Sequence, residues 1–249
     1  MSLSLPTVRI ALVTGGAGGI GSAVCRRLAA DGYHVVVGVH TGAGRAEELV
    51  TDIEKAGGTA EVVRFDVADP ERVRAVFEEV LVHHGRLDVV VNNAGTTAPR
   101  PLSALDDATY QQVFDVNVRG ALNVLREAGL RLADWGRVVN ISSTLVQAPI
   151  EGSGVYAASK AALELFSTVA SKELGSRGIT VNALRVGPTV PGMFEQAPAE
   201  RRAALAEASP FKRLGQPQDV ADVIAFLVSD AGRWITGQVI TVDGGATPS

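Results

Sequence analysis

The stretch Thr14-Gly15-Gly16-Ala17-Gly18-Gly19-Ile20-Gly21 decides the fold of this 249-residue chain. It follows the apolar run Val8–Val13, which predicts a strand, and leads into Ile20–Ala30, whose spacing predicts a helix. Glycines at such a junction let the backbone turn tightly and let its N–H groups approach a pyrophosphate, to which the helix N-terminus adds partial positive charge. A purely structural turn is the alternative, but the strand–turn–helix context favours a phosphate-binding loop.

Predicted strands and helices alternate along the rest of the chain. Further strands are predicted at His34–Val39, Ala60–Phe65, Leu87–Val91, Arg137–Ile141, Thr180–Leu184 and Gln238–Val242. Helices are predicted at Arg45–Ala56, Pro70–His84, Ala108–Ala133 and Val155–Ser176. The strands are apolar without clean alternation, which is typical of strands that helices cover on both faces. We therefore expect an α/β fold, a single-domain Rossmann-type doubly wound parallel sheet of about seven strands with helices on both faces.

Residues 1–249 are expected to form one domain, because no linker, low-complexity segment or long repeat interrupts the alternation. The irregular region is Gly187–Pro210, which contains four prolines and two short polar or Ala-rich pieces. We interpret residues 187–210 as a loop over the strand ends, the usual place of a substrate lid. Met193 and Phe194 would give this loop an apolar inner face, or alternatively anchor it to the core.

Composition excludes several classes of function. The net charge of −4 and the lack of a basic stripe argue against a nucleic-acid partner. No run of 18 apolar residues is present, and the N-terminus lacks a secretory pattern, so neither a membrane span nor a signal peptide is expected. The single cysteine, Cys25, can form no internal disulfide, which fits a reducing compartment and a cytoplasmic protein.

Metal and hydrolase motifs are not expected either. The four histidines are His34, His40, His83 and His84, and none has a metal-binding spacing such as HExxH. No Gly-x-Ser-x-Gly elbow is present. His83 and His84 end a predicted helix, where partial positive charge suits the helix dipole. The sequence thus predicts no metal site.

Six short motifs are spread over nearly the whole chain. They are TGxxxGIG with Gly15, Gly19 and Gly21, Asn92-Asn93-Ala94-Gly95, Ile141-Ser142-Ser143, Tyr156-Ala157-Ala158-Ser159-Lys160, Lys212-Arg213-Leu214-Gly215 and Asp243-Gly244-Gly245. In kind and order they resemble the short-chain dehydrogenase/reductase family, in particular its 3-oxoacyl-(acyl-carrier-protein) reductases. The resemblance implies an oxidoreductase that interconverts a ketone and a secondary alcohol by hydride transfer with a nicotinamide cofactor. A 3-oxoacyl thioester, with an acyl carrier as partner, is the substrate expected first. Sugar, polyol or steroid-like alcohols, or a non-catalytic NADP-binding regulator, are the alternatives.

Tyr156 and Lys160 are four residues apart on a predicted helix and therefore share one face. A free tyrosine has a pKa of about 10, and a nearby ammonium lowers it by favouring the phenolate. The resemblance implies that Tyr156 is the general acid or base, that Ser143 hydrogen-bonds the substrate oxygen, and that Lys160 also binds the nicotinamide ribose. Ser143, rather than Ser142, has the family's spacing to Tyr156.

Asn117 matches the family's helix asparagine, whose expected role is to hold a water that connects Lys160 to solvent. A buried structural asparagine is the alternative. The resemblance places further residues near the cofactor: Gly15, Gly19, Ile20, Gly21, Asp66, Val67, Asn92, Ala94, Gly95, Gly187 and Thr189. Asp66 has a second interpretation as the cap of a turn, and Asn93 is expected to hold neighbouring strands together.

The end of the second predicted strand indicates which nicotinamide cofactor binds. A carboxylate there would bind the ribose 2′-hydroxyl of NAD, but the chain has Val39-His40-Thr41. Arg45 follows a flexible glycine-containing stretch and is placed to pair with a 2′-phosphate, with His40 and Thr41 as hydrogen-bond donors. A solvated arginine at a helix start is the alternative. We therefore expect NADP(H) rather than NAD(H).

The chain departs from the family pattern after the sixth predicted strand. The segment reads Arg185-Val186-Gly187-Pro188-Thr189, with Val186 where the family usually has proline. The nicotinamide carboxamide normally meets this backbone, so Thr189 is expected to offer a replacement hydroxyl. Family members usually form homotetramers with two-fold symmetry, and the same assembly is expected here.

Overall fold

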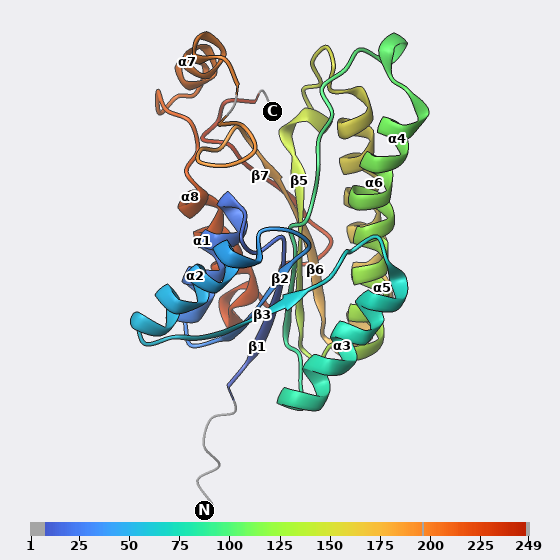
Figure 1. Ribbon diagram of the computed structural model, residues 1–249, viewed down its shortest axis with the longest axis vertical. Coiled ribbons are helices and arrows are strands. Elements are labelled where there is room, and N and C mark those ends of the chain that lie inside the picture. The colour runs from blue at the N-terminus through green and yellow to red at the C-terminus, as the bar shows by residue number, and fades with distance from the viewer. Residues whose placement is uncertain (1–7, 196, 248–249) are drawn as a thin grey trace, which may run out of the picture.

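Seven strands form one sheet in the order β3-β2-β1-β4-β5-β6-β7, and each neighbouring pair is parallel (Figure 1). The computed structural model describes residues 8–195 and 197–247, so the other residues of the expected domain lie outside the description. The strands are β1 (Ile10–Thr14), β2 (His34–Val39), β3 (Thr59–Arg64), β4 (Val89–Asn92), β5 (Arg137–Ser143), β6 (Thr180–Val186) and β7 (Val239–Val242). The predicted doubly wound parallel sheet is confirmed.

Helices cover both faces of this sheet (Figure 1). One layer contains α1 (Gly19–Ala30), α2 (Ala43–Lys55) and α8 (Pro217–Val228), and the other contains α3 (Pro70–His84), α5 (Ala121–Arg131) and α6 (Gly154–Glu173). Side chains alternate across each strand, so Val13 points into the first layer while its neighbour Leu12 points into the second. Both are fully buried, which explains why the sequence shows continuous apolar runs instead of alternation.

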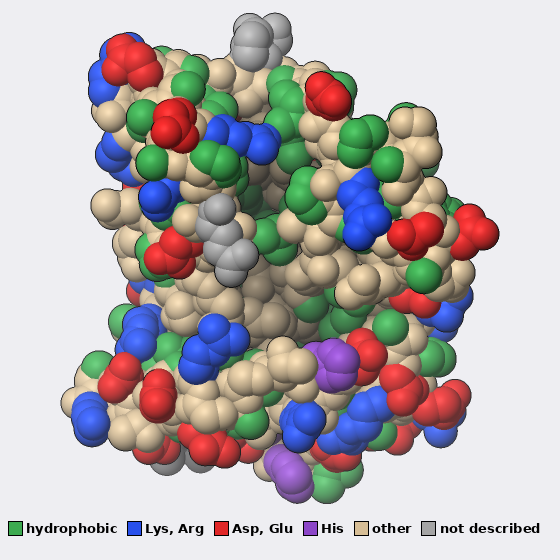
Figure 2. Space-filling model, turned by 45° about the horizontal axis from the view of Figure 1, so that its top comes forward, with side chains coloured by type: hydrophobic (Ala, Val, Ile, Leu, Met, Phe, Trp, Pro, Cys, Tyr) green, Lys and Arg blue, Asp and Glu red, His purple; other side chains and the backbone are tan. Residues whose placement is uncertain are grey.

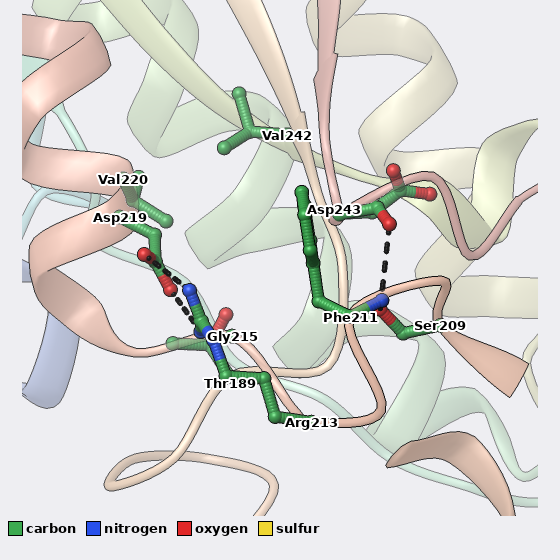
Figure 3. Close-up of a pocket in the computed structure, with 10 residues that line it drawn as sticks. Thr189, Ser209, Phe211, Arg213, Gly215, Asp219, Val220, Val242 and Asp243 are labelled. Carbon is green, nitrogen blue, oxygen red and sulfur yellow. Dashed lines mark hydrogen bonds and ion pairs between the residues drawn. The ribbon is translucent and has the colours of Figure 1, made fainter. Parts of the chain in front are cut away.

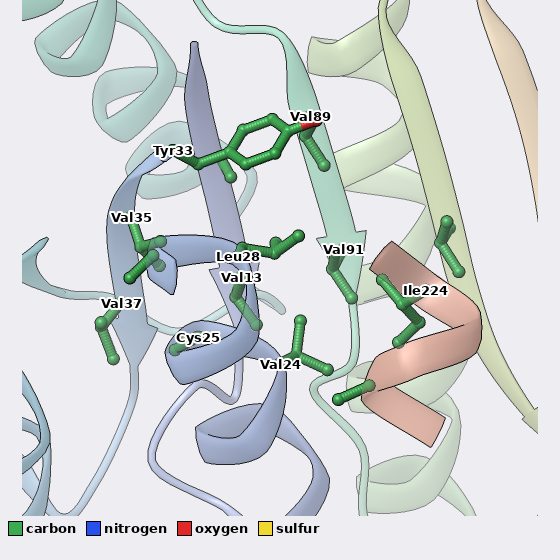
Figure 4. Close-up of a cluster of buried hydrophobic side chains, with 14 of the residues drawn as sticks. Val13, Val24, Cys25, Leu28, Tyr33, Val35, Val37, Val89, Val91 and Ile224 are labelled. Atoms are coloured by element: carbon green, nitrogen blue, oxygen red, sulfur yellow. The ribbon is translucent and has the colours of Figure 1, made fainter. Parts of the chain in front are cut away.

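The core of the first layer is built from small branched side chains. Val24 and Leu28 of α1 and Ile224 of α8 pack against the strand side chains Val13 and Val91 (Figure 4). All five are almost completely excluded from solvent. This packing fixes the start of α1 relative to the ends of β1 and β4.

The direction of winding reverses between β1 and β4. From β1 the chain moves outward to β2 and β3, and then returns to the other side of β1 through α3 to form β4. The loops after β1 and β4 therefore separate to opposite faces of the sheet. In open α/β sheets, ligands bind in the crevice that such a reversal opens at the carboxyl ends of the strands.

The helical stretch predicted over Ala108–Ala133 is helical from Asp107 to Arg131, but it is not α-helical throughout. The segment divides into α4 (Asp107–Phe114), a π-helical turn at Asp115–Gly120, and α5. The wider turn carries Asn117, whose side chain hydrogen-bonds the backbone of Thr96 in a neighbouring loop. Such π-turns occur frequently at functional sites.

The region after β6 is more ordered than expected. Pro198 precedes a helix, α7 (Ala199–Ala208), whose alanines favour helix formation. The loop predicted over 187–210 therefore contains a helix in its second half, and Gln196 lies outside the described residues. Within the described ranges, none of the helices combines the length and hydropathy needed to cross a bilayer.

Candidate active site

The loops that follow β1, β4, β5 and β6 meet at the carboxyl edge of the sheet. Seen from that edge, the surface is hollowed between the α7 side and the α4 side of the molecule (Figure 2). Most of the residues for which a cofactor or catalytic role was predicted lie on these loops, on the strand and helix ends that flank them, or on the first turns of α6. Asn117 lies in the π-turn, and the others follow β2 and β3. The parallel arrangement of the strands brings them together.

The glycine loop after β1 adopts a shape that side chains would prevent. Gly15 has a φ of +64°, and the N–H of Gly16 donates to the carbonyl of Gly38 in β2 at 2.9 Å. A Cβ on Gly21 would lie 2.2 Å from the Gly15 carbonyl oxygen, so only glycine fits. The first turn of α1 carries no acidic side chain and Gly18 supplies no side-chain cap, which leaves the helix N-terminus suited to an anion.

Position 19 requires glycine for a different reason. A Cβ there would lie 2.2 Å from the carbonyl oxygen of Pro191, so the loop after β6 presses directly on the loop after β1. Ile20, the next residue, packs its side chain against the first core layer. The cofactor contacts predicted for both residues stay predictions.

Hydrogen bonds from Thr14 and Asn93 join the ends of β1 and β4. The Thr14 hydroxyl oxygen accepts from the backbone N–H groups of Asn93 and Ala94, each at 3.0 Å. In return, the Asn93 side-chain amide donates to the carbonyls of Thr14 and Gly15, each at 3.0 Å. Asn93 thus connects neighbouring strands, as expected. Sequence reasoning missed Thr14, although a hydroxyl at the last position of a buried strand is a signal for such a contact.

Asn92 and Gly95 border the same loop in different ways. The amide of Asn92 is buried and donates to the carbonyl of Ala121 at 3.2 Å, which ties β4 to α5. Gly95 lies close to the reacting groups, because a Cβ at this position would be 3.3 Å from Lys160 Nζ and 3.4 Å from Asn117 Oδ1. The lack of a side chain at Gly95 therefore leaves room for both polar groups.

Asn117 fixes the segment that follows Gly95. Its Oδ1 accepts from the N–H of Thr96 at 2.8 Å, and its Nδ2 donates to the carbonyl of Thr96 at 2.8 Å and to the hydroxyl of Ser159 at 3.0 Å. These contacts match the structural alternative for the side chain. The water expected between Asn117 and Lys160 stays a prediction. The spacing of the motif did not indicate that Ser159 takes part in holding Asn117.

Ser143, Tyr156 and Lys160 converge beside this loop. Ser143 ends β5, and its hydroxyl hydrogen-bonds Tyr156 of α6. Lys160, one turn further along α6, donates from Nζ to the carbonyl of Ile141 at 2.7 Å, and Nζ lies 5.8 Å from the centre of the Tyr156 ring. The lysine is 3% exposed. A hydroxyl, a phenol and an ammonium thus occupy one buried corner.

Burial dominates the proton affinities in this corner. It raises the pKa of the Tyr156 phenol, and the hydrogen bond from Ser143 offsets this only in part. Burial also lowers the pKa of the Lys160 ammonium to about 8. The net direction for Tyr156 is opposite to the lowering expected from Lys160, because loss of hydration disfavours the phenolate. In this state the tyrosine is held as a proton donor.

Ser142 and Ser143 face different partners. The Ser142 hydroxyl donates to Glu164 at 2.6 Å, and Arg185 donates to both oxygens of the same carboxylate at 2.9 and 2.7 Å. The Glu164 side chain is only 9% exposed, so the bidentate pair satisfies an otherwise costly buried charge. The structure places Ser143, and not Ser142, against Tyr156, as the spacing predicted.

The ends of β2 and β3 carry the groups predicted to select the cofactor. Arg45 is exposed in the first turn of α2, and its guanidinium folds toward Gly42, the residue before the helix. His40 is exposed and its Nε2 lies 4.0 Å from Asp66. Arg64 lies beside them and donates to the carbonyl of His40 at 3.2 Å, a second cation that sequence reasoning missed.

Asp66 and Val67 make contacts within the protein. Asp66 Oδ1 accepts from the N–H of Ala68 at 2.9 Å, which is the turn cap given as an alternative. The carbonyl of Val67 accepts from the buried amide of Asn123 at 3.0 Å. The Val67 side chain also packs closely on Gly120 in the π-turn. The contact with an adenine ring stays a prediction.

Val186 extends β6 beyond its predicted end. It is buried and pairs with Ser143 on one side and Val242 on the other. Proline lacks the N–H group that a central strand uses, so valine suits this position in the ladder. A Cβ on Gly187 would lie 2.6 Å from the Cβ of Asp243. The Thr189 hydroxyl donates to the carbonyl of Gly187 at 2.9 Å, so its proton is already engaged.

A cavity of about 160 Å³ lies beside Thr189, between the end of β7 and the start of α8 (Figure 3). Phe211 and Asp243 border it on one side, and the ion pair between Arg213 and Asp219 borders it on the other. Ser143, Tyr156 and Lys160 do not line it. This cavity belongs to the loop after β6 and not to the reacting groups.

Known proteins of the same architecture match nearly the whole chain. A family model described as enoyl-(acyl-carrier-protein) reductase matches residues 15–247. A short-chain type dehydrogenase/reductase of Picea abies is 38% identical over 248 residues, which cover 95% of this chain and 92% of the relative. A 3-oxoacyl-(acyl-carrier-protein) reductase of Staphylococcus aureus is 36% identical over 237 residues, with 94% and 96% covered. A solved short chain dehydrogenase of Burkholderia cenocepacia in complex with NADP is 38% identical, with a TM-score of 0.90 over 96% of this chain and 97% of that one.

Proposed function

Since the chain belongs to the short-chain dehydrogenase/reductase family, we propose that it uses NADP(H) to interconvert a ketone and a secondary alcohol, with Tyr156 as the proton donor and acceptor. Family membership makes it an oxidoreductase acting on the CH–OH/C=O couple. The observation that carries the proposal is the convergence of Ser143, Tyr156 and Lys160 at the carboxyl edge of the sheet. This arrangement also argues against a non-catalytic regulator, for which the three groups would have no common task.

The hydroxyls of Ser143 and Tyr156 polarise the substrate. In the reductive direction, the ketone oxygen accepts hydrogen bonds from both and becomes negative as its carbon is reduced. The nicotinamide, when bound, supplies the hydride for that carbon. The Tyr156 O–H bond then breaks, its proton moves to the substrate oxygen, and the phenolate remains. Because burial raises its pKa, Tyr156 carries its proton at neutral pH, and transfer of that proton depends on stabilisation of the phenolate that remains.

Lys160 supports the phenolate after proton transfer. Its ammonium lies near the ring and is held there by the carbonyl of Ile141. With a pKa of about 8 it is charged at neutral pH, and positive charge next to a phenolate stabilises it. In the proposal, Lys160 also binds the nicotinamide ribose, and a water held at Asn117 returns a proton from solvent.

The residues present fit a nicotinamide dinucleotide phosphate. Gly21 leaves the backbone free to curve around a pyrophosphate at the start of α1. Arg45 opens α2 with positive charge where the helix dipole favours an anion, and no acidic side chain lies in that first turn. A cation at this end of a helix is repelled by the helix dipole, and a bound 2′-phosphate would offset that repulsion because it attracts both. The solved relative from Burkholderia cenocepacia in complex with NADP supports the same choice.

We propose a 3-oxoacyl thioester as the substrate class, with an acyl carrier as the partner that delivers it. The support is 36% identity to a 3-oxoacyl-(acyl-carrier-protein) reductase over nearly the full length of both chains. Sugar, polyol or steroid-like alcohols are the alternative, because one framework can host many substrates. The loop over 187–210 is the segment that we expect to contact the substrate. In that loop Met193 is 58% exposed, whereas Phe194 packs under the guanidinium of Arg201 in α7. Met193 is therefore the better candidate for a substrate contact.

We propose that the chain forms a homotetramer with two-fold symmetry. Leu165 and Val169 lie one turn apart on α6 and are 64% and 45% exposed, and Leu122 of α5 is 37% exposed. On the opposite layer, Phe226 of α8 is 48% exposed and Trp234 before β7 is 94% exposed. Exposed apolar side chains grouped on two layers favour two self-complementary interfaces.

We also propose a cytoplasmic location, for which Cys25 gives the support. The thiol is unpaired and buried in the first core layer, where burial raises its pKa well above the ordinary value. A thiol that is neither in a disulfide nor activated fits a reducing compartment.

Replacing Tyr156 tests the catalytic assignment. Tyr156→Phe removes the proton donor but keeps the ring, so kcat for the NADPH-dependent reduction of an acetoacetyl thioester should fall about 100- to 10,000-fold. The loss of reduced-nicotinamide absorbance measures the rate. Tyr110→Phe, on an exposed tyrosine of α4, is the matched control and should retain full turnover. Unchanged turnover in Tyr156→Phe would show that another group transfers the proton, whereas failure of the wild type with this thioester would move the search to other ketones.

Arg45→Ala tests the cofactor preference. Loss of a charge-assisted hydrogen bond costs about 1.5–3 kcal/mol, so KM for NADPH should rise roughly 10- to 100-fold while KM for NADH stays constant. Initial rates with each cofactor at saturating ketone measure this. Arg74→Ala, on the exposed face of α3, should change neither KM. Equal increases for both cofactors would contradict a role for Arg45 at the 2′-phosphate.

The pH profile of ketone reduction should report Lys160. Below pH 8 the ammonium is charged; as the pH rises through about 8 it loses its proton, and kcat/KM should fall tenfold per unit. Tyr156 keeps its proton over this range because its pKa is raised. In Lys160→Arg the guanidinium stays charged, so the decline of any residual activity should move to higher pH. A decline that stays near pH 8 in this variant would assign it to another group.

Light scattering tests the assembly. A homotetramer has four times the chain mass of 25.9 kDa. Leu165→Glu should lower the measured mass by placing a charge in an apolar interface, whereas Leu130→Glu, on an equally exposed leucine of α5, should not. A wild-type mass of one chain at micromolar concentration would overturn the proposal.

A further inference from the structure

Three side chains that the reaction does not use gather at the amino ends of the strands, at the opposite edge of the sheet from Tyr156. His34 is the first residue of β2, Glu61 lies near the start of β3, and His84 is the last residue of α3. In Figure 1 this is the lower end of the sheet, where the described chain begins. The crossover through α3 returns the chain to this edge, so residues far apart in sequence become neighbours.

The three side chains present their metal-binding atoms to one another. His84 Nε2 lies 2.8 Å from Glu61 Oε1, and His34 Nε2 lies 3.9 Å from the same oxygen. The two imidazole rings are 4.6 Å apart at their centres. One ligand atom from each residue lies within 4.8 Å of the other two. Two imidazoles and a carboxylate are the ligands of many zinc sites and suit neighbouring transition metals.

One of these atoms has no partner in the described structure. His34 Nε2 is buried and, among the described residues, makes no hydrogen bond. A buried imidazole nitrogen without a partner is costly unless something completes its interactions. Burial and the neighbouring His84 ring lower the pKa of His34, while Glu61 raises it.

The spacing also fits a metal ion. Tetrahedral zinc with bonds of 2.0–2.1 Å holds its ligand atoms about 3.3 Å apart. The two imidazole nitrogens lie 2.8 and 3.9 Å from Glu61 Oε1, on either side of this distance, so small side-chain rotations would bring the atoms into place. The side chains of His34, Glu61 and His84 are 20%, 40% and 18% exposed, which leaves one side open for a water and for entry of the ion.

We propose that His34, Glu61 and His84 form a binding site for one zinc-like transition-metal ion, which stabilises the fold by joining β2, β3 and the end of α3. The site is separate from the reacting groups, since it lies at the other end of the strands. Its expected effect is on stability and not on the chemical step.

The experiment uses the full-length chain without a histidine tag, after removal of metals with a chelator. Calorimetry with Zn²⁺ should show one ion per chain, and Co²⁺ should give the visible d–d absorption of a tetrahedral site. At a hundredfold excess over Kd, Zn²⁺ should raise Tm by roughly 5–10 °C. Mg²⁺ should have no effect, because it prefers oxygen ligands in octahedral geometry.

Single substitutions separate this site from adventitious binding. His34→Gln and Glu61→Gln should each abolish the cobalt absorption and the Tm shift while keeping NADPH-dependent turnover, which verifies folding. His83→Gln is the matched control, because His83 is the exposed neighbour of His84 and should leave both signals intact. Absence of the signals in the wild type, or equal signals in His34→Gln, would overturn the proposal and leave His84 and Glu61 as a hydrogen-bonded pair.

Discussion

The hydrogen bonds between the ends of β1 and β4 are the constraint on which the rest of the site depends. Winding in opposite directions from these two strands opens a crevice, and without a connection their loops would move independently. Thr14 and Asn93 provide that connection with donors and acceptors on both sides. The same Asn93 amide lies within 3.0 Å of the position that a Cβ on Gly15 or Gly21 would take, so the glycine loop is shaped around it.

A series of short contacts runs from this connection to the reacting groups. Gly95 follows directly and leaves room for Lys160 and Asn117, and Asn117 holds the next residue, Thr96, from the π-turn. Lys160 in turn is held by the carbonyl of Ile141 in β5, two residues before Ser143. Ser143 and the carbonyl that holds Lys160 thus both belong to β5, and Tyr156 bonds to Ser143, so one strand of a rigid sheet places all three reacting groups.

The strands were predictable because apolar runs mark buried parallel strands whose carboxyl ends share one edge. Ser143, Tyr156 and Lys160 were singled out by their spacing together with the resemblance to the family, and the structure places them side by side. The π-turn at Asp115–Gly120 was not predictable, because one inserted residue hardly changes the hydrophobic spacing of a helix. The raised pKa of Tyr156 depends on how much water the folded chain excludes, which no spacing records. The grouping of His34, Glu61 and His84 likewise arises only from the crossover that places α3 beside β2 and β3.

The close approach of Pro191 to Gly19 divides the loop after β6 into two parts of different character. Up to Gly192 the backbone is pinned, by the β-bridge between Thr189 and Gly215 and by the contact with the glycine loop. Beyond it, Met193 and α7 extend outward with no buried residue in the helix. The outer part is thus free of core packing, so we expect changes of sequence there to leave the reacting groups in place. A graft intended to alter the choice of substrate should therefore begin after Gly192, where the pinned backbone ends.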